Sequence, residues 1–275
     1  MSIITLTTDM GTRDHYVAAV KGRILGLLPG SSIVDVTHEV KPFDNAHTAF
    51  VVRNAWPNFP EGTVHVIGVN PEADAHTPHL AVKHAGHWFI GADNGIFSLI
   101  FEGRPEAVFT LNPTDDQDAM TFPTKCIFAP AACHLARGGA VEEIASPASG
   151  IRQMIGFTPA TDQESIRGAV IHIDIYGNAV TNIHRDLFVR VVKDRSFRIA
   201  FGRSQNDITT IHRTYSEVPQ GERVAFFGAS GLLEIAVNKG AEGSGGGAAR
   251  LFGLHVQDPV RIEMQDILPQ RAYAS

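Results

Sequence analysis

Residues 3–69 alternate between strand-like and helix-like patterns, and this alternation restricts the possible folds more than any other feature of the chain. The expected elements, in order, are a strand at 3–8, a helix at Tyr16–Leu28, a buried strand at Ile33–Val36, a helix at Ala46–Ala55 that begins near Pro42-Phe43-Asp44, and a strand at Thr63–Val69. Such a succession predicts an α/β domain whose mainly parallel sheet is covered by helices and binds ligands beyond the carboxyl ends of its strands. Asp9 and Asn70 both lie at such ends.

The rest of the chain divides at a change of pattern near residue 157. Before it, a hairpin around Ala85-Gly86 and a helix at Phe128–Leu135 complete an α/β domain over residues 1–156. Residues 157–165 are polar and irregular, as is typical of a linker. Beyond them the apolar residues follow the period of a strand in the segments 168–174, 197–201, 223–227, 232–237 and 260–263. These short strands predict a small β-barrel or sandwich as a second domain over residues 166–275.

Composition and charge argue against several classes of protein. The 275 residues are 44% hydrophobic and 19% charged, which is ordinary for a globular protein. The net charge of -6, with scattered lysines and arginines, argues against a nucleic-acid partner. No apolar run approaches a membrane span and the N-terminus lacks the pattern of a signal peptide, so we expect a cytoplasmic protein with no membrane partner. Cys126 and Cys133 are expected to be two buried thiols rather than a disulfide framework.

The turn Thr8-Asp9-Met10-Gly11-Thr12 places a carboxylate directly after the first strand. The two carboxylate oxygens of Asp9 can accept hydrogen bonds from a vicinal diol such as that of a ribose. The alternative is a structural role, because Asp and Thr before a helix commonly cap it. Asp14 could bring a second carboxylate to the same pocket, or it could be a surface residue.

The turn Asp174-Ile175-Tyr176-Gly177-Asn178 follows an apolar strand in the second domain. Gly177-Asn178 is a natural pair for a tight turn, which needs no function. The same five residues also offer a carboxylate, an aromatic face and an amide, which are the groups needed to bind a charged group and a purine ring. Both interpretations remain open on spacing alone.

Two further patterns have ordinary explanations. His76, His79, His84 and His87 have spacings that suggest a metal site, but they would be spread over a loop and two strand ends, so no metal is expected. The glycine-rich segment 243–247 lacks the Lys-Ser/Thr that follows a phosphate-binding loop, and we expect a flexible loop there.

Taken together, the segments resemble the family of S-adenosylmethionine hydroxide adenosyltransferases and the related S-adenosylmethionine-dependent fluorinase and chlorinase. The resemblance extends over nearly the whole chain. It rests on Asp9-Met10-Gly11-Thr12 with Asp14, Val34-Asp35-Val36-Thr37-His38, Pro42-Phe43-Asp44, Asp93-Asn94-Gly95, Phe128-Ala129-Pro130-Ala131-Ala132, Asp174-Ile175-Tyr176-Gly177-Asn178 with Thr181-Asn182-Ile183, and Gly231-Leu232-Leu233-Glu234-Ile235-Ala236-Val237-Asn238.

The resemblance implies an N-terminal α/β domain, a C-terminal β-barrel, and a homotrimer whose pocket lies between one subunit's first domain and a neighbour's second. It implies S-adenosylmethionine or adenosine as the ligand, no separate cofactor, and substitution at the 5′ carbon of the ribose with methionine as the leaving group. The implied roles are Asp9 on the ribose hydroxyls, Phe43 over the sugar, Tyr176 and Asn178 at adenine, Asp14 and Asp174 at the methionine ammonium, and Ser230 among the substrate-binding residues.

The chain departs from the family at the water-activating residues. The hydrolase subgroup has an Asp-Arg-His set there, and the aligned residues here are Asn70, Thr77 and Pro123. Thr124 aligns with a serine that contacts halide in the fluorinase, whereas Ala73 stands where that enzyme has a threonine. Three hypotheses follow: a hydrolase in which Asn70 and Thr124 are catalytic and position a water, a halide-using adenosyltransferase, and a binder of adenosyl ligands without turnover.

Overall fold

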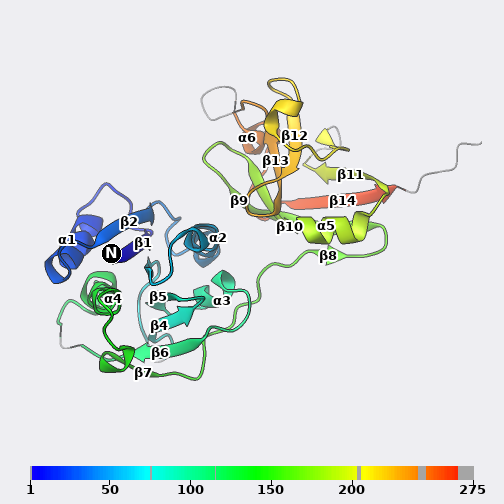
Figure 1. Ribbon diagram of the computed structural model, residues 1–275. Helices are drawn as coiled ribbons and strands as arrows, with labels where there is room; N and C mark the ends of the chain where they lie inside the picture. The colour runs from blue at the N-terminus through cyan, green and yellow to red at the C-terminus, as the bar shows by residue number, and fades with distance from the viewer. Residues whose placement is uncertain (1, 75, 115, 203–205, 241–245, 266–275) are drawn as a thin grey trace, which may run out of the picture. The chain divides into compact units, whose positions relative to one another are not determined.

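The computed structural model describes residues 2–74, 76–114, 116–202, 206–240 and 246–265. The chain forms two compact units, residues 1–156 and 157–275, and each is described by itself (Figure 1). None of the helices in these described ranges is long and apolar enough to cross a membrane.

The first unit is built on a seven-stranded sheet with the strand order β2-β1-β3-β5-β4-β6-β7. Its strands are β1 (Ile3–Thr8), β2 (Ser32–Thr37), β3 (Val64–Gly68), β4 (His79–His84), β5 (His87–Ala92), β6 (Ala107–Leu111) and β7 (Ala145–Pro147). The β2-β1, β1-β3 and β3-β5 pairs are parallel, and the remaining three pairs are antiparallel. The sheet is therefore mixed, with its parallel half formed by the N-terminal alternation. The hairpin expected around Ala85-Gly86 is confirmed as β4 and β5.

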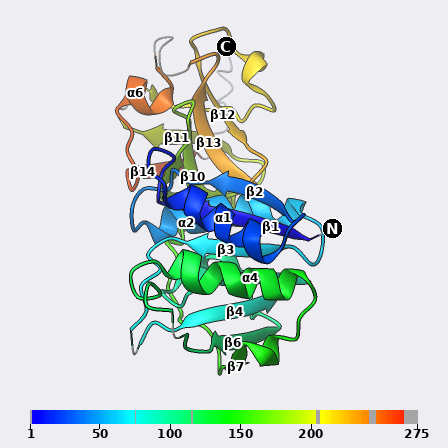
Figure 2. The same ribbon diagram turned by 90° about the vertical axis from the view of Figure 1, so that its left-hand side faces the viewer.

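Helices cover both faces of this sheet. They are α1 (Tyr16–Leu27), α2 (Asn45–Ala55), α3 (Ile96–Ile100) and α4 (Ala129–Ala136), with short helical turns at Trp56–Asn58, Thr124–Phe128 and Val141–Glu143. The helices α1 and α4 pack together on one face and α2 and α3 on the other, as Figures 1 and 2 show. Apolar side chains of the strands are buried between these layers, which is why the central strands β1 and β3 are almost fully buried.

The expectation of a buried strand at Ile33–Val36 is wrong. Strand β2 lies at the edge of the sheet with β1 as its one neighbour, and Val34 is 37% exposed. An apolar run indicates a strand, but it does not distinguish an edge strand from a central one. The entry to α2 is as expected, because the Asp44 side chain accepts a hydrogen bond from the His47 N–H and caps the helix.

The second unit is a curled antiparallel sheet, a half-barrel, with the strand order β11-β14-β9-β10-β13-β12. Its elements are β8 (Ala160–Thr161), β9 (Ser165–Ile173), β10 (Ala179–His184), α5 (Arg185–Val192), β11 (Ser196–Phe201), a helical turn at Tyr215–Glu217, β12 (Arg223–Phe227), β13 (Leu232–Val237), α6 (Ala248–Phe252) and β14 (Pro259–Gln265). The five strands predicted here are all present. Part of the segment expected to be an irregular linker forms β8, which pairs with β9.

Both cysteines are free and buried, as the sequence predicts. Cys126 lies in the turn before α4 and Cys133 in α4 itself. Burial raises the pKa of both thiols, so they remain protonated. The glycine-rich loop predicted at 243–247 falls largely on residues 243–245, which lie outside the described residues.

Candidate functional site

A first group of candidate residues meets where β1 and β3 end. These strands are parallel neighbours, with Thr8 paired to Gly68, so the residues that follow them emerge at the same edge of the sheet. Asp9 follows β1, and its Oδ2 accepts a hydrogen bond from the Phe43 N–H at 3.0 Å. Asn70 follows β3 with a left-handed φ of 46°, a conformation that Asn tolerates better than most residues.

Thr124 completes this group from a distant part of the chain. Its side chain is fully buried, and its hydroxyl has no hydrogen-bond partner among the described residues. Gly68 leaves the space that Thr124 fills, because a Cβ on Gly68 would lie 2.8 Å from Thr124 Oγ1. A buried hydroxyl without a partner is costly, and this one lies beside the strand end that leads to Asn70. The hydroxyl thus keeps an unused hydrogen-bonding capacity just beneath this edge of the sheet.

The capping alternative for Asp9 finds no support in the structure. The N-cap of α1 is His15, and no side chain caps this helix. Asp14 is exposed in the bend just before α1. Phe43 is 71% exposed and has a positive φ of 63°, and its backbone is fixed by the bond to Asp9. The Phe43 side chain is thus open to solvent, and the backbone of Phe43 contacts the Asp9 carboxylate.

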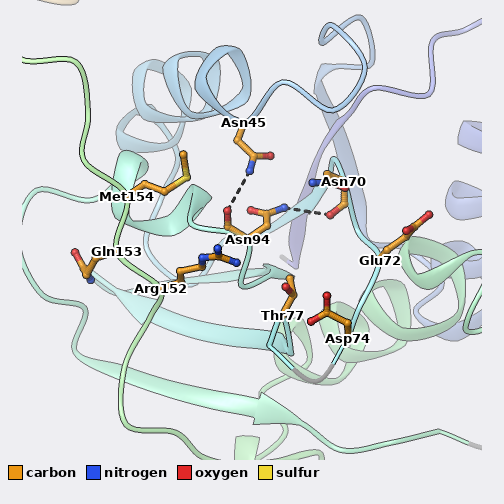
Figure 3. A pocket seen from close by; sticks show the side chains of 9 residues that line it. All are labelled: Asn45, Asn70, Glu72, Asp74, Thr77, Asn94, Arg152, Gln153 and Met154. Atoms are coloured by element: carbon orange, nitrogen blue, oxygen red, sulfur yellow. Dashed lines mark hydrogen bonds between the residues drawn. The ribbon is translucent and has the colours of Figure 1, made fainter.

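A pocket of about 440 Å³ opens on the same side of the first unit, and Asn70 is one of its walls (Figure 3). Its lining residues are Asn45, Asn70, Glu72, Asp74, Thr77, Asn94, Arg152, Gln153 and Met154. These side chains include amides, two carboxylates and one guanidinium, so the pocket is polar and charged rather than apolar. Water and small charged groups suit such a lining.

Hydrogen bonds fix the walls of this pocket. Asn94 donates to the backbone oxygens of Val69 and Asn70 at 3.4 and 3.1 Å. Both carboxylate oxygens of Asp93 accept from the backbone N–H of Arg152, which holds the segment after β7 against the pocket rim. Burial raises the pKa of Asp93, although the bonds to Arg152 oppose that effect. Arg152 therefore enters the pocket from a fixed backbone.

The second group of candidate residues lies in the turn between β9 and β10. Asp174 Oδ1 accepts from the backbone N–H groups of Tyr176 and Asn178 at 2.9 and 2.8 Å. Asp174 Oδ2 accepts from the Asn178 amide at 2.8 Å, and that amide also donates to the Tyr215 hydroxyl at 3.1 Å. Tyr176 stays 61% exposed at the tip of the turn. Asp174 and Asn178 thus brace each other, while the Tyr176 ring is left free to contact a ligand.

Two residues that sequence analysis did not select join this second group. Tyr215 lines a pocket of about 210 Å³ with Tyr176 and Asn178. Its pKa is raised to about 12, first by burial and then by the carboxylates of Glu234 and Asp174. Burial and the charge of Asp174 raise the pKa of Glu234 to about 7. Glu234 belongs to the segment Gly231-Leu232-Leu233-Glu234-Ile235-Ala236-Val237-Asn238, which indicates a family resemblance but no role for this carboxylate, and the sequence around Tyr215 carries no signal of a site.

Ser230 lies in the turn that precedes β13. Its hydroxyl accepts a hydrogen bond from the Leu232 N–H at 3.3 Å, which is a local turn contact. A role for Ser230 in substrate binding stays a prediction.

The histidines that resembled a ligand set have other partners. The ring of His79 bonds to the Pro71 carbonyl, and that of His87 to buried His65 at 3.2 Å. Burial lowers the pKa of His65 to about 3, with a smaller contribution from His87, so this pair is uncharged. Trp56 stacks edge-on against His84 and His87.

One other group has metal-ligating atoms close together within the described ranges. Its ligand atoms, from Asp116, Asp118 and Cys126, lie within 4.8 Å of one another. Lys125 pairs with Asp118 at 3.5 Å and offsets part of its charge. The Cys126 thiol is protonated, which makes it a poor metal ligand.

Comparison with known proteins covers both units. Residues 4–145 match the model of the SAM hydroxide adenosyltransferase N-terminal domain, and residues 168–261 match that of the C-terminal domain. The chain is 32% identical to an (R)-S-adenosyl-L-methionine hydrolase of Thermus thermophilus, covering 95% of this chain and 100% of the relative. It is 30% identical to a protein of the same name from Salinispora arenicola, covering 94% and 97%.

Similarity extends also to a fluorinase, over a smaller share of the chain, and to a solved structure. A fluorinase of an Actinoplanes species is 30% identical over 66% of this chain and 72% of its own length. The crystal structure of an uncharacterised conserved protein from Thermotoga maritima superposes with a TM-score of 0.82 at 28% identity, covering 94% of this chain and 99% of that one.

Proposed function

This chain belongs to the SAM hydroxide adenosyltransferase family of enzymes, and from this premise we propose that it is an S-adenosylmethionine hydrolase. The reaction is attack of water on the 5′ carbon of the ribose, which releases adenosine and methionine. The hydrolases of Thermus thermophilus and Salinispora arenicola are similar over nearly the whole chain, whereas the Actinoplanes fluorinase is similar over two thirds of it.

The observation that carries the proposal is that Asp9 and Asn70 follow neighbouring parallel strands, β1 and β3, and that Thr124 packs against the last residue of β3. In our proposal the Asp9 carboxylate accepts hydrogen bonds from the ribose hydroxyls. Asn70 and the unpartnered hydroxyl of Thr124 hold the attacking water in line with the carbon–sulfur bond. A water held in place reacts far faster than one that must first be captured from solution.

The nature of the leaving group determines which catalytic groups the protein needs. Breaking the carbon–sulfur bond returns an electron pair to the positively charged sulfur, so methionine leaves as a neutral thioether and needs no acid. The enzyme must align the water and exclude other solvent. Phe43 would cover the sugar for this purpose, since its side chain is exposed and its backbone N–H bonds to the proposed ribose-binding carboxylate.

The residues of the second unit would bind the other parts of the ligand. We propose that Tyr176 and Asn178 contact adenine, that Asp174 contacts the methionine ammonium together with Asp14 of the first unit, and that Ser230 also binds the substrate. The chain would assemble as a homotrimer in which the first unit of one subunit and the second unit of a neighbour bind the same ligand, in the cytoplasm and without a separate cofactor.

Chromatography of S-adenosylmethionine incubated with the pure protein tests the proposal. The expected product is adenosine, in equal amount with methionine, whether or not halide is present. The Thr124 hydroxyl would also donate to a halide ion, so chloride, bromide and fluoride are tested in parallel. A halogenated deoxyadenosine would instead support the halide-using alternative. Tight binding without any product would support a non-catalytic binder, and no binding would defeat all three.

A further inference from the structure

The proposed hydrolysis releases one proton, and the two residues proposed to hold the attacking water cannot accept it. When water attacks the ribose carbon, the new oxygen carries two hydrogens and a positive charge. Asn70 offers an amide and Thr124 a hydroxyl, and neither is basic at neutral pH. A group that accepts this proton should be ionised and open to the same pocket as Asn70.

Asp74 meets both requirements. It lines the pocket of about 440 Å³ together with Asn70, and Figure 3 shows it beside Thr77 on one wall with Arg152 across from it. Asp74 Oδ1 accepts from the His76 N–H at 2.6 Å. That bond lowers the pKa of Asp74, and hydrogen bonds from the Thr77 side chain and backbone lower it further. The carboxylate therefore stays ionised over a wide range of pH.

The loop that carries Asp74 is held at both ends. The ring of buried His79 bonds to the Pro71 carbonyl at 2.8 Å, and the Asp93 N–H donates to the Pro78 carbonyl at 2.8 Å. Asp74 and Thr77 also pair as an isolated β-bridge. These bonds fix the position of the carboxylate relative to the strand end that carries Asn70.

We propose that Asp74 is the proton acceptor for the attacking water, with Thr77 as the residue that positions its carboxylate. This assignment rests on the proposed hydrolase function. It gives the uncharged Thr77 a defined role, because its N–H donates to the Asp74 backbone carbonyl at 3.2 Å and holds the turn that carries the carboxylate.

The step balances without any other reactant. The oxygen of water bonds to the 5′ carbon while the carbon–sulfur bond breaks and its electron pair stays on sulfur. One proton of the attached water passes to Asp74, directly or through a second water, and adenosine and neutral-thioether methionine remain. A protonated alcohol is a much stronger acid than a carboxylic acid, so even a weakly basic carboxylate accepts this proton. Asp74 is exposed and returns the proton to solvent.

The other charged or titratable side chains of this loop and pocket are Glu72, His76 and Arg152. Glu72 provides the matched control because it is a second carboxylate on the same pocket wall, outside the bonded turn. Arg152 is the cation of the lining, and its backbone is fixed by Asp93.

The test is the single-turnover rate of adenosine formation in Asp74→Asn, Asp74→Ala and Glu72→Gln. We expect the rate to fall about 100-fold or more in both Asp74 variants, and to fall far less in Glu72→Gln, because Glu72 lines the pocket but lies outside the turn that fixes Asp74. The affinity for S-adenosylmethionine should stay near that of the wild type. Added formate should restore part of the rate in Asp74→Ala, where it can occupy the space of the lost carboxylate, and should not affect Glu72→Gln. Thermal unfolding of each variant checks that the fold is intact.

The possible failures are distinguishable. If the wild type forms adenosine and Asp74→Asn forms it at the same rate, the Asp74 assignment is wrong and the hydrolase function stands. If the wild type itself forms no adenosine, the function fails and the assignment fails with it. A rate loss in Asp74→Ala that formate does not relieve, matched by an equal loss in Glu72→Gln, would indicate general disruption of the pocket and overturn the assignment.

Discussion

At the scale of single residues, Asp9 is the group on which ligand affinity should depend most. Its Oδ2 accepts from the Phe43 N–H, and Oδ1 has room for another donor. A hydrogen bond to a charged group contributes about 1.5–3 kcal/mol. Asp9→Ala should therefore weaken the binding of S-adenosylmethionine at least about tenfold in a calorimetric titration.

Asp9→Asn is the matched variant for this measurement, since an amide oxygen still accepts from Phe43. It should fold like the wild type and bind with intermediate affinity. If Asp9→Ala bound the ligand as tightly as the wild type, the ribose assignment would be wrong.

Glu234 makes a separate prediction about pH. Burial and Asp174 raise its pKa in the folded state to about 7, from an ordinary value of 4.5. Between these values the folded state holds a proton that the unfolded state has lost, so the folded state becomes less stable as pH rises through this window. Above about pH 7 the folded state has also lost this proton, and its stability no longer depends on the titration of Glu234. Glu234→Gln removes the titration, so its unfolding midpoint should rise relative to that of the wild type as pH increases from about 4.5 to about 7.

Differential scanning calorimetry across this range measures the effect. Glu222→Gln, at an exposed carboxylate in the same unit, serves as the control and should track the wild type. Parallel pH curves for wild type and Glu234→Gln would contradict the assignment of a raised pKa.

At the scale of elements, the contact between β3 and the turn before α4 determines the surroundings of Thr124, which is proposed to hold the attacking water. An alanine Cβ at position 68 would lie 2.7 Å from the Thr124 methyl carbon, so Thr124 or the strand must shift. Overpacking of this kind costs about 1–3 kcal/mol. Gly68→Ala should lower the unfolding free energy by this amount and slow adenosine formation.

Gly22→Ala in α1 is the control for that substitution. A Cβ there meets no atom within 4 Å, and the change removes a glycine from a helix. It should stabilise the protein by about 0.5–1 kcal/mol and leave the reaction rate unchanged. If the two alanine variants behaved alike in denaturant titration, the steric argument about Gly68 would fail.

The elements also show what could be predicted from sequence. The ends of β1 and β3, the cap of α2 and the Asp174 turn were predicted because each depends on a few neighbouring residues. The exposure of β2 depends on its having one neighbouring strand, which its own residues do not encode. Asp74 and Tyr215 gain their importance from contacts made after folding, and nothing in the adjacent sequence marks them.

At the scale of the whole molecule, mixing two variants tests whether one ligand is bound by the first unit of one subunit and the second unit of a neighbouring subunit. Asp9→Ala disables the proposed site residues of the first unit and Asn178→Ala those of the second. Co-expressed chains that exchange subunits at random should contain roughly a quarter intact sites, because both contributors must be unaltered. Each variant alone should form adenosine much more slowly than the wild type when S-adenosylmethionine is kept below the concentration that saturates the variant.

The control is a chain carrying both substitutions, co-expressed with each single variant, which should restore nothing. Light scattering on the same samples gives the mass of the assembly. If every site were formed within one chain, the mixture would form adenosine no faster than the single variants do. A monomeric mass would contradict the proposed trimer.

The position of Asn94 in the sequence and its hydrogen bonds have a consequence for asparagine deamidation in the pocket. Deamidation proceeds when the backbone nitrogen of the next residue attacks the side-chain amide. Pro71 has no N–H to do this, so Asn70 is protected, whereas Asn94 is followed by unhindered Gly95. The amide of Asn94 donates to the backbone of Val69 and Asn70. Slow deamidation in storage would therefore leave Asn70, which is proposed to position the water, unchanged. It would convert Asn94, the residue whose amide holds the Asn70 backbone.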